Sequence, residues 1–313
     1  MRSILFSTRR SYGRTALLMV LSLALILATG CGAPRPGERD TEIITAAQAL
    51  ELLQSNPNAV LVDVRPGVEF NREHIQGAVS VSRADIVVNT PFPALLAPPE
   101  QIERNLGRRG ISNQSLVIAY DDNNSMDSAR LWWTLKVYGH HDVKVVSGGY
   151  NALLAAGAAV SSTAPSVTAA TFRAQPADQS MLISATDVRR WVNEPDPAVV
   201  LIDNRSPDEF SEGSIPGAIH LDFIGNLFRD GTFRPARHIY IRHAGAGVDY
   251  NTQAILYCAT SIRSAQAFLA MYNAGYRGMR IYDGAWVEWS ANPMNPIFVP
   301  EQPGGRVRSA DAS

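Results

Sequence analysis

The fold is decided by one stretch of sequence that occurs twice, as DVRPGVEF at residues 63–70 and as DNRSPDEF at residues 203–210. Three signals follow it in the same order in both copies. They are a GA pair at 77–78 and 217–218, an apolar tetrapeptide that ends in Tyr at 117–120 and 254–257, and a Gly-containing turn at 147–150 and 283–286. Signals that repeat in one order indicate a tandem duplication.

Length and composition agree with two globular domains. The chain has 313 residues, against the ~100 to 200 typical of one domain. Hydrophobic residues make up 46% and charged residues 18%, which argues against disorder. The net charge is -1, so the chain lacks the basic excess that is typical of nucleic-acid-binding proteins, and nucleic acid is not expected as a partner.

The two copies share one order of elements. Capping-box patterns at 45–48 and 184–187 begin a helix, and continuous apolar runs at 59–64 and 198–203 follow, as in strands covered on both faces. Later helices end at Gly139 and Gly275, before strands expected at 143–146 and 279–282. This alternation predicts an α/β fold of two tandem domains, each a small mainly parallel sheet with helices on both faces.

The N-terminal segment resembles a bacterial lipoprotein leader. Arginines precede an apolar run at 16–28 that is too short for a comfortable membrane span, and the run ends LATGC at 27–31. We expect a signal peptide at 1–30, a lipidated Cys31 and a tether at 31–40, which would anchor the protein to a membrane of the cell envelope, facing the periplasm or the exterior. An ordinary signal peptide or an uncleaved anchor is the alternative, and TRRSY at 8–12 leaves the export route open.

Beyond the tether, the expected boundaries are domain 1 at 41–155, a linker at 156–179, domain 2 at 180–300 and a flexible tail at 301–313. The linker is rich in Ala, Ser, Thr and Pro.

Cys258 is the candidate reactive residue. Only two cysteines occur, Cys31 and Cys258, which excludes a cysteine-based zinc cluster, and no cofactor or metal is expected. Cys258 follows the strand run at 254–257 and precedes a helix expected to begin near Ser264, at the sheet edge where reactive sites lie. Loop amides, the positive helix end and Arg263 would favour a thiolate and hold an anion. The alternative is a small buried hydrophobic residue at a strand end.

Three further motifs carry a family resemblance. YDGAWVEW at 282–289, FNREHIQGA at 70–78 and FSEGSIPGA at 210–218 resemble the signatures of tandem-domain rhodaneses, the thiosulfate and 3-mercaptopyruvate sulfurtransferases. The resemblance covers roughly residues 41–297, and the two earlier motifs depart once each, at Gln76 and Ser214.

The resemblance implies a ping-pong sulfur transfer. A Cys258 thiolate would take the sulfane sulfur of a small anionic donor and pass it, from a persulfide, to a thiophilic acceptor such as cyanide or a thiol. Arg205 resembles the family arginine that reaches the donor, with a structural salt bridge to Asp203 or Glu209 as the alternative. Thiosulfate is expected as the donor in preference to 3-mercaptopyruvate. The loop residues expected to bind the substrate are Ala259, Thr260, Ser261, Ile262, Arg263 and Ser264.

The first copy is expected to be noncatalytic. It has Asp121 and Asp122 opposite Cys258 and Asp127 opposite Arg263, and a carboxylate cannot carry sulfane sulfur. Its expected role is to wall the pocket, and the candidates for that are Arg130, Trp132 and Trp133, with core packing as the alternative for at least one tryptophan. Asp203 and Asp283 are expected to hold loops in place, because the chemistry needs no general base.

Two other functions remain open. A noncatalytic module would trap sulfane sulfur or an oxidant at Cys258 without turnover. A phosphatase of the dual-specificity kind would need HCx5R, whereas Cys258 and Arg263 form Cx4R after Tyr257. The role of residues 222–251, which carry several Arg and His residues that could steer anions, is not assigned.

Overall fold

The computed structural model describes residues 41–300 and 306–308. The predicted signal peptide and tether, Cys31 included, therefore lie outside the described residues. The first half contains strands β1 Ile43–Ile44, β2 Ala59–Asp63, β3 His74–Ile75, β4 Val79–Ser80, β5 Val87–Val88, β6 Leu95–Leu96, β7 Leu116–Tyr120, β8 Val143–Val146 and β9 Val160–Ser161, and helices α2 Ala46–Ser55, α3 Gly67–Arg72, α4 Arg83–Ile86, α5 Pro99–Gly107, α6 Met126–Val137 and α7 Gly149–Ala155.

The second half contains strands β10 Leu182–Ile183, β11 Val199–Asp203, β12 Ile219–His220, β13 Gln253–Tyr257, β14 Met279–Tyr282, β15 Ile297–Val299 and β16 Arg306–Arg308, helices α8 Ala185–Asn193, α9 Pro207–Glu212, α10 Ala236–Ala244, α11 Ile262–Ala274 and α12 Ala285–Ala291, and the short turns η1 Gln179–Met181 and η2 Phe223–Asn226.

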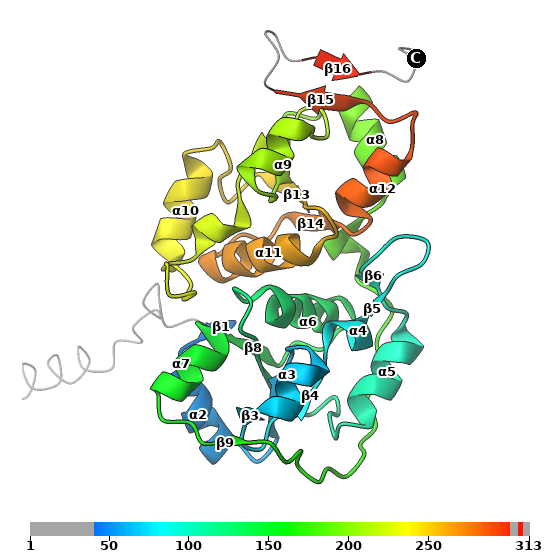
Figure 1. Ribbon diagram of the computed structural model, residues 1–313. Coiled ribbons are helices and arrows are strands. Elements are labelled where there is room, and N and C mark those ends of the chain that lie inside the picture. The colour runs from blue at the N-terminus through cyan, green and yellow to red at the C-terminus, as the bar shows by residue number, and fades with distance from the viewer. Residues whose placement is uncertain (1–40, 301–305, 309–313) are drawn as a thin grey trace, which may run out of the picture. The chain divides into compact units, whose positions relative to one another are not determined.

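Two five-stranded parallel sheets form the framework (Figure 1). Their strand orders are β1-β8-β7-β2-β4 and β10-β14-β13-β11-β12, which correspond strand for strand. The register matches as well, since Asp63 pairs with Tyr120 in one sheet and Asp203 with Tyr257 in the other. The predicted α/β fold of two tandem domains is confirmed.

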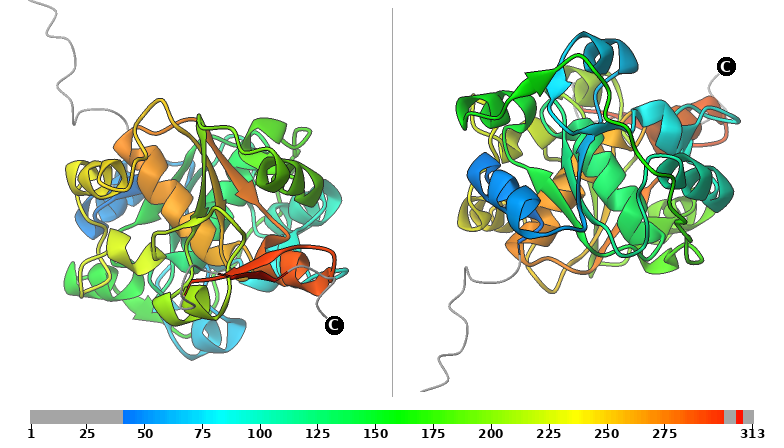
Figure 2. Two further views of the ribbon diagram at one scale, coloured as in Figure 1. Left: turned by 90° about the horizontal axis from the view of Figure 1, so that it is seen from above. Right: turned by 90° about the horizontal axis from the view of Figure 1, so that it is seen from below.

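Each sheet carries helices on both faces (Figure 2). One set of buried side chains joins the first sheet to α2 and α7, and another joins the second sheet to α8 and α12. The opposite faces of both sheets contribute to a single core that includes α5, α6, α10 and α11. Since the described residues from Glu42 onward belong to one compact unit, the two halves share this core.

Helices α6 and α11 meet in the centre of that core. Trp132 of α6 packs against Phe268 and Tyr272 of α11, with ring centroids 6.1 and 5.3 Å apart. Trp132 and Trp133 are both fully buried, so both are core residues, and this agrees with the packing alternative.

Local signals explain most helix ends. Thr45 caps α2 in a complete capping box, and Ser184 accepts a hydrogen bond from the Asp187 amide at the start of α8. Gly275 ends α11 in the left-handed region, with φ 112°. The helix expected near Ser264 begins earlier, at Ile262, because Ser261 takes the left-handed conformation (φ 65°) as its N-cap.

Residues 222–251 are the counterpart of residues 82–111 in the first half. In both places a short helix or turn, a paired two-stranded segment and a longer helix follow each other: α4, β5–β6 and α5 in one half, and η2, the Leu227–Phe233 bridge and α10 in the other. Each segment reaches the other half, since Leu96 N–H donates to Asp283 Oδ2 (2.6 Å) and Phe233 N–H donates to Ser147 Oγ (2.9 Å). The segment at 222–251 therefore helps to join the halves.

Among the helices of the described chain, none combines the length and apolar character needed to cross a membrane.

Candidate active site

Cys258 lies between the last residue of β13 and the N-cap of α11, as the sequence predicts. Its carbonyl oxygen accepts a hydrogen bond from Trp286 N–H (2.9 Å), and the Ala259 carbonyl accepts one from Val287 N–H (3.2 Å). The first turn of α12 therefore holds the carbonyl side of the loop. Within the described chain, the amides of residues 259–264 donate to no other protein group, so they remain available to a negative charge at Cys258.

The first half contains the same loop with its centre filled. Asp121 stands at the place of Cys258, and its Oδ1 accepts hydrogen bonds from the amides of Asn123 (2.9 Å) and Ser125 (3.0 Å). Its Oδ2 accepts from the amide (2.7 Å) and the hydroxyl (2.9 Å) of Ser128. Burial raises the pKa of Asp121, while the Ser128 and Asn123 amides oppose that rise. The loop is therefore a cradle of three amides and one hydroxyl around an acidic group.

Ser264 is the counterpart of Ser128 at the third position of its helix. Its hydroxyl is fully buried and has no hydrogen-bond partner among the described residues. A buried hydroxyl without a partner is costly, so a ligand that accepts its hydrogen bond would be stabilised. In the second half, this donor is free for a sulfur atom on Cys258.

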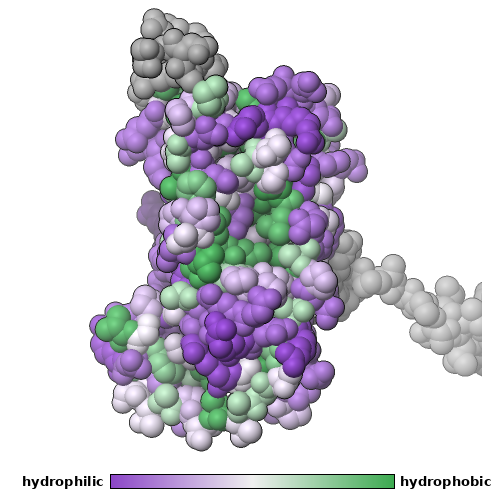
Figure 3. All heavy atoms as spheres, turned by 90° about the vertical axis from the view of Figure 1, so that its right-hand side faces the viewer, coloured by the Kyte–Doolittle hydropathy of each residue, from purple (hydrophilic) through white to green (hydrophobic). Residues whose placement is uncertain are grey.

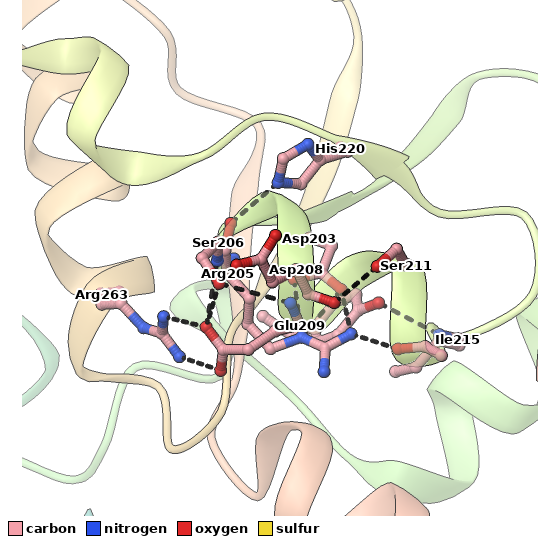
Figure 4. Close-up of polar contacts among 11 residues, drawn as sticks. Asp203, Arg205, Ser206, Asp208, Glu209, Ser211, Ile215, His220 and Arg263 are labelled. Carbon is pink, nitrogen blue, oxygen red and sulfur yellow. Dashed lines mark hydrogen bonds and ion pairs between the residues drawn. The ribbon is translucent and has the colours of Figure 1, made fainter. Parts of the chain in front are cut away.

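Arg263 is paired with Glu209 of α9 (Figure 4). Arg263 Nη1 lies 2.5 Å from Glu209 Oε2, and Nη2 lies 2.7 Å from Oε1. Hydrogen bonds to Glu209 are the main cause of a pKa for Arg263 above its usual value, and the nearby Cys258 side chain adds to it. The same pair lowers the pKa of Glu209 to about 2. The sequence indicates Glu209 only as an alternative partner of Arg205, and no local spacing indicates its pair with Arg263, 54 positions away.

Arg205 lies in a buried ion pair with Asp203 (Figure 4). Its Nε donates to Asp203 Oδ1 (3.0 Å) and its Nη2 donates to Asp203 Oδ2 (2.6 Å). Nη2 also donates to the Gly213 carbonyl (2.6 Å). Its guanidinium lies over the Trp286 ring, 4.3 Å from the centroid. Arg65 makes the same pair with Asp63 in the half without a cysteine. This placement matches the salt-bridge alternative for Arg205, and contact of Arg205 with the donor stays a prediction.

Arg130 of α6 extends from the first half to the loop. Its Nη1 donates to Ser261 Oγ (2.7 Å) and to Asp283 Oδ1 (2.9 Å), and Ser261 Oγ also donates to Asp283 Oδ1 (2.9 Å). Nη2 donates to the Ala94 carbonyl of the β5–β6 hairpin (3.1 Å). Asp283 thus has the loop-holding place expected of it, and Arg130 positions Ser261 rather than lining an open pocket.

The other predicted loop residues divide into two groups. Ala259 and Thr260 are partly exposed, whereas the Ile262 side chain is buried in the shared core, so that only its backbone can face a ligand. Cys258 itself is fully buried. Within residues 41–300, no cluster of three or more His, Cys, Asp or Glu side chains is arranged to hold a metal ion.

Comparisons with known proteins agree with the repeat. The sequence model described as "Rhodanese-like domain" matches residues 45–156 and 184–292. A protein of Mycobacterium bovis named "Putative thiosulfate sulfurtransferase 1" is 30% identical over 275 residues, which cover 82% of this chain and 97% of the relative. A "Probable 3-mercaptopyruvate sulfurtransferase" of Pseudomonas aeruginosa is 28% identical over 81% of this chain and 97% of the relative.

Solved structures share the fold. The 3-mercaptopyruvate sulfurtransferase SseA of Escherichia coli superposes with a TM-score of 0.71 and 25% identity, covering 79% of this chain and 99% of SseA. The structure of EanB gives a TM-score of 0.72 at 22% identity and covers 82% of this chain and 68% of EanB.

Proposed function

The chain belongs to the rhodanese family of sulfurtransferases, and on that premise we propose that it transfers the sulfane sulfur of thiosulfate through a persulfide on Cys258. The observation that carries this proposal is the pair of loops with different centres. In the first half the cradle closes on the Asp121 carboxylate, and in the second half the matching amides and the Ser264 hydroxyl are left without a partner around Cys258. These donors suit an anionic persulfide, whose terminal sulfur takes the place of a carboxylate oxygen.

The transfer needs no external electron source. The Cys258 thiolate attacks the outer sulfur of thiosulfate, a new S–S bond forms, and the S–S bond of thiosulfate breaks as sulfite leaves with the electron pair. Cyanide or a thiolate then attacks the terminal sulfur of the persulfide, takes it, and returns Cys258 to the thiolate. Since the reaction begins and ends with an ionised thiol, Asp203 and Asp283 serve as loop supports.

The first half supports the second without chemistry of its own. Asp121 offers no sulfur, and its carboxylate already occupies the local cradle. Its contribution to the proposed reaction is the Arg130 contact with Ser261 and the hairpin amide of Leu96 on Asp283. Since Cys258 is fully buried, a donor reaches the sulfur only after a neighbouring side chain moves.

Turnover with thiosulfate and cyanide tests the proposal. We expect repeated thiocyanate formation, and a gain of one sulfur on the tryptic peptide that contains Cys258 after treatment with donor alone. The Cys258→Ser variant should fold normally and do neither, because a hydroxyl has similar volume but forms no persulfide. Sulfur on another residue, or activity in the variant, would refute the assignment, and a single stoichiometric sulfuration without turnover would support the binding or sensing module.

3-Mercaptopyruvate is the second candidate donor. The name of the relative in Pseudomonas aeruginosa contains this substrate, whereas the name of the relative in Mycobacterium bovis contains thiosulfate. A comparison of kcat/KM for the two donors decides between them.

We also propose that Cys31 is lipidated and tethers the protein to a membrane of the bacterial cell envelope. The support is the LATGC sequence at 27–31 together with the apolar run before it.

A further inference from the structure

Three arginines border the Cys258 loop, and each is paired with one carboxylate. The pairs are Arg130 with Asp283, Arg205 with Asp203, and Arg263 with Glu209. The side chains of the first two arginines are 0% and 3% exposed, whereas Arg263 is 20% exposed. Arg263 is therefore the cation that an incoming anion can reach most easily.

The charge of Arg263 is already neutralised. Both terminal nitrogens of Arg263 are engaged by both oxygens of Glu209, a two-pronged geometry that is among the strongest for an ion pair. An anion that approaches Cys258 therefore meets the attraction of Arg263 together with the repulsion of Glu209. Both effects scale with the charge of the anion.

We propose that Glu209 is a specificity-determining residue that disfavours doubly charged donors relative to singly charged ones. This inference rests on the proposed function and adds a donor-charge rule to it. If removal of the Glu209 charge improves the binding of a singly charged donor by some factor, the binding of a doubly charged donor improves by the square of that factor. Thiosulfate carries two charges and 3-mercaptopyruvate carries one, so their ratio of kcat/KM reports the factor directly.

The variant Glu209→Gln removes the charge and preserves the local fold. Glu209 Oε2 accepts hydrogen bonds from the amide (3.1 Å) and the hydroxyl (2.9 Å) of Ser206, which forms the capping box of α9. Gln serves the same position in capping boxes, because its side-chain oxygen accepts the same bonds. The start of α9 therefore stays in place while the partner charge of Arg263 disappears.

The first half provides a matched control. Glu69 stands at the repeat position of Glu209 and pairs with the exposed Arg72 on the protein surface. Glu69→Gln makes the same chemical change to the net charge, in the half that lacks the cysteine. It should leave the donor ratio unchanged.

The experiment measures kcat/KM for thiosulfate and for 3-mercaptopyruvate, with cyanide as acceptor, in the unmodified protein and in both variants. Removal of the single charge of Glu209 at this partly exposed site should raise the ratio of kcat/KM for thiosulfate to kcat/KM for 3-mercaptopyruvate by about threefold to tenfold. The shift should shrink as ionic strength rises, since salt screens exposed charges. Arg263→Gln leaves Glu209 without its counter-charge, so its ratio should move in the opposite direction.

The outcomes separate two kinds of failure. Equal changes for both donors, an unchanged ratio in Glu209→Gln, or shifts of the same sign in Glu209→Gln and Arg263→Gln would overturn the charge rule. If Glu209→Gln does not fold, the double variant Glu209→Gln/Arg263→Gln is compared with Arg263→Gln, because these two differ only in the charge of Glu209, and equal donor ratios in the two would overturn the rule. An unmodified protein without turnover on either donor would instead refute the proposed function.

Discussion

The serine that follows Arg263 gives the sharpest test of the cradle. Ser264 Oγ has no partner in the described chain, whereas its repeat counterpart, Ser128 Oγ, donates to Asp121 (2.9 Å). Replacement of each serine by alanine should therefore have opposite effects. In Ser264→Ala, stability should be unchanged or slightly higher, because a buried unsatisfied hydroxyl disappears. In Ser128→Ala, stability should fall by about 1–3 kcal/mol, because a buried carboxyl loses a donor.

Activity should show the reverse pattern. A hydrogen bond to a charged group contributes about 1.5–3 kcal/mol, so the loss of the Ser264 donor to an anionic persulfide should lower kcat/KM by roughly 10-fold to 150-fold. Ser128→Ala should retain most of the activity, since Asp121 takes no part in the transfer. Thiosulfate-to-cyanide kinetics and urea unfolding of both variants measure the two effects. A Ser264→Ala variant that is less stable, or that keeps full activity, would refute the cradle.

Three further predictions concern Arg205, Glu209 and Cys31. Arg205→Ala and the control Arg65→Ala should each lower the free energy of unfolding by about 3–5 kcal/mol in urea titrations, because each leaves a buried carboxylate unpaired. A raised KM for thiosulfate at unchanged stability would instead show that Arg205 binds the donor. Because the pKa of Glu209 is lowered to about 2 in the folded protein, its pair with Arg263 stabilises the fold above the ordinary glutamate pKa, and this contribution is lost as pH falls from about 5 towards 2. The melting temperatures of the unmodified protein and Glu209→Gln should therefore converge over that range, and a constant difference would contradict the ion pair. The Cys31→Ser variant should no longer be found in the membrane fraction of the native host. If it stays in that fraction and keeps its N-terminal segment, the apolar run is an ordinary anchor.

The positions of strands, helices and the cysteine could be predicted from the sequence because they depend on neighbouring residues. Apolar runs, Thr45 and Ser184 at helix starts, and Gly275 at a helix end act over a few positions along the chain. The repeat also shows that Cys258 and Asp121 occupy corresponding positions, each directly after the tyrosine that ends a strand. The early start of α11 was missed, since a left-handed serine N-cap has no strong sequence signal.

Only the tertiary structure decided which charges meet. Glu209 and Arg263 are 54 positions apart, and Arg130 and Asp283 are 153 positions apart, so neither pair can be read from local spacing. The Arg205–Asp203 pair is different, since its members are two residues apart and the sequence already indicates it as one alternative for Arg205. Buried apolar side chains shared by both halves bring α6 and α11 together, and that packing carries Arg130 to the Cys258 loop. At the surface, Figure 3 shows apolar residues gathered across the middle of one face. The sequence therefore determined the repeated fold and the candidate nucleophile, while long-range packing determined the partners of Arg130 and Arg263.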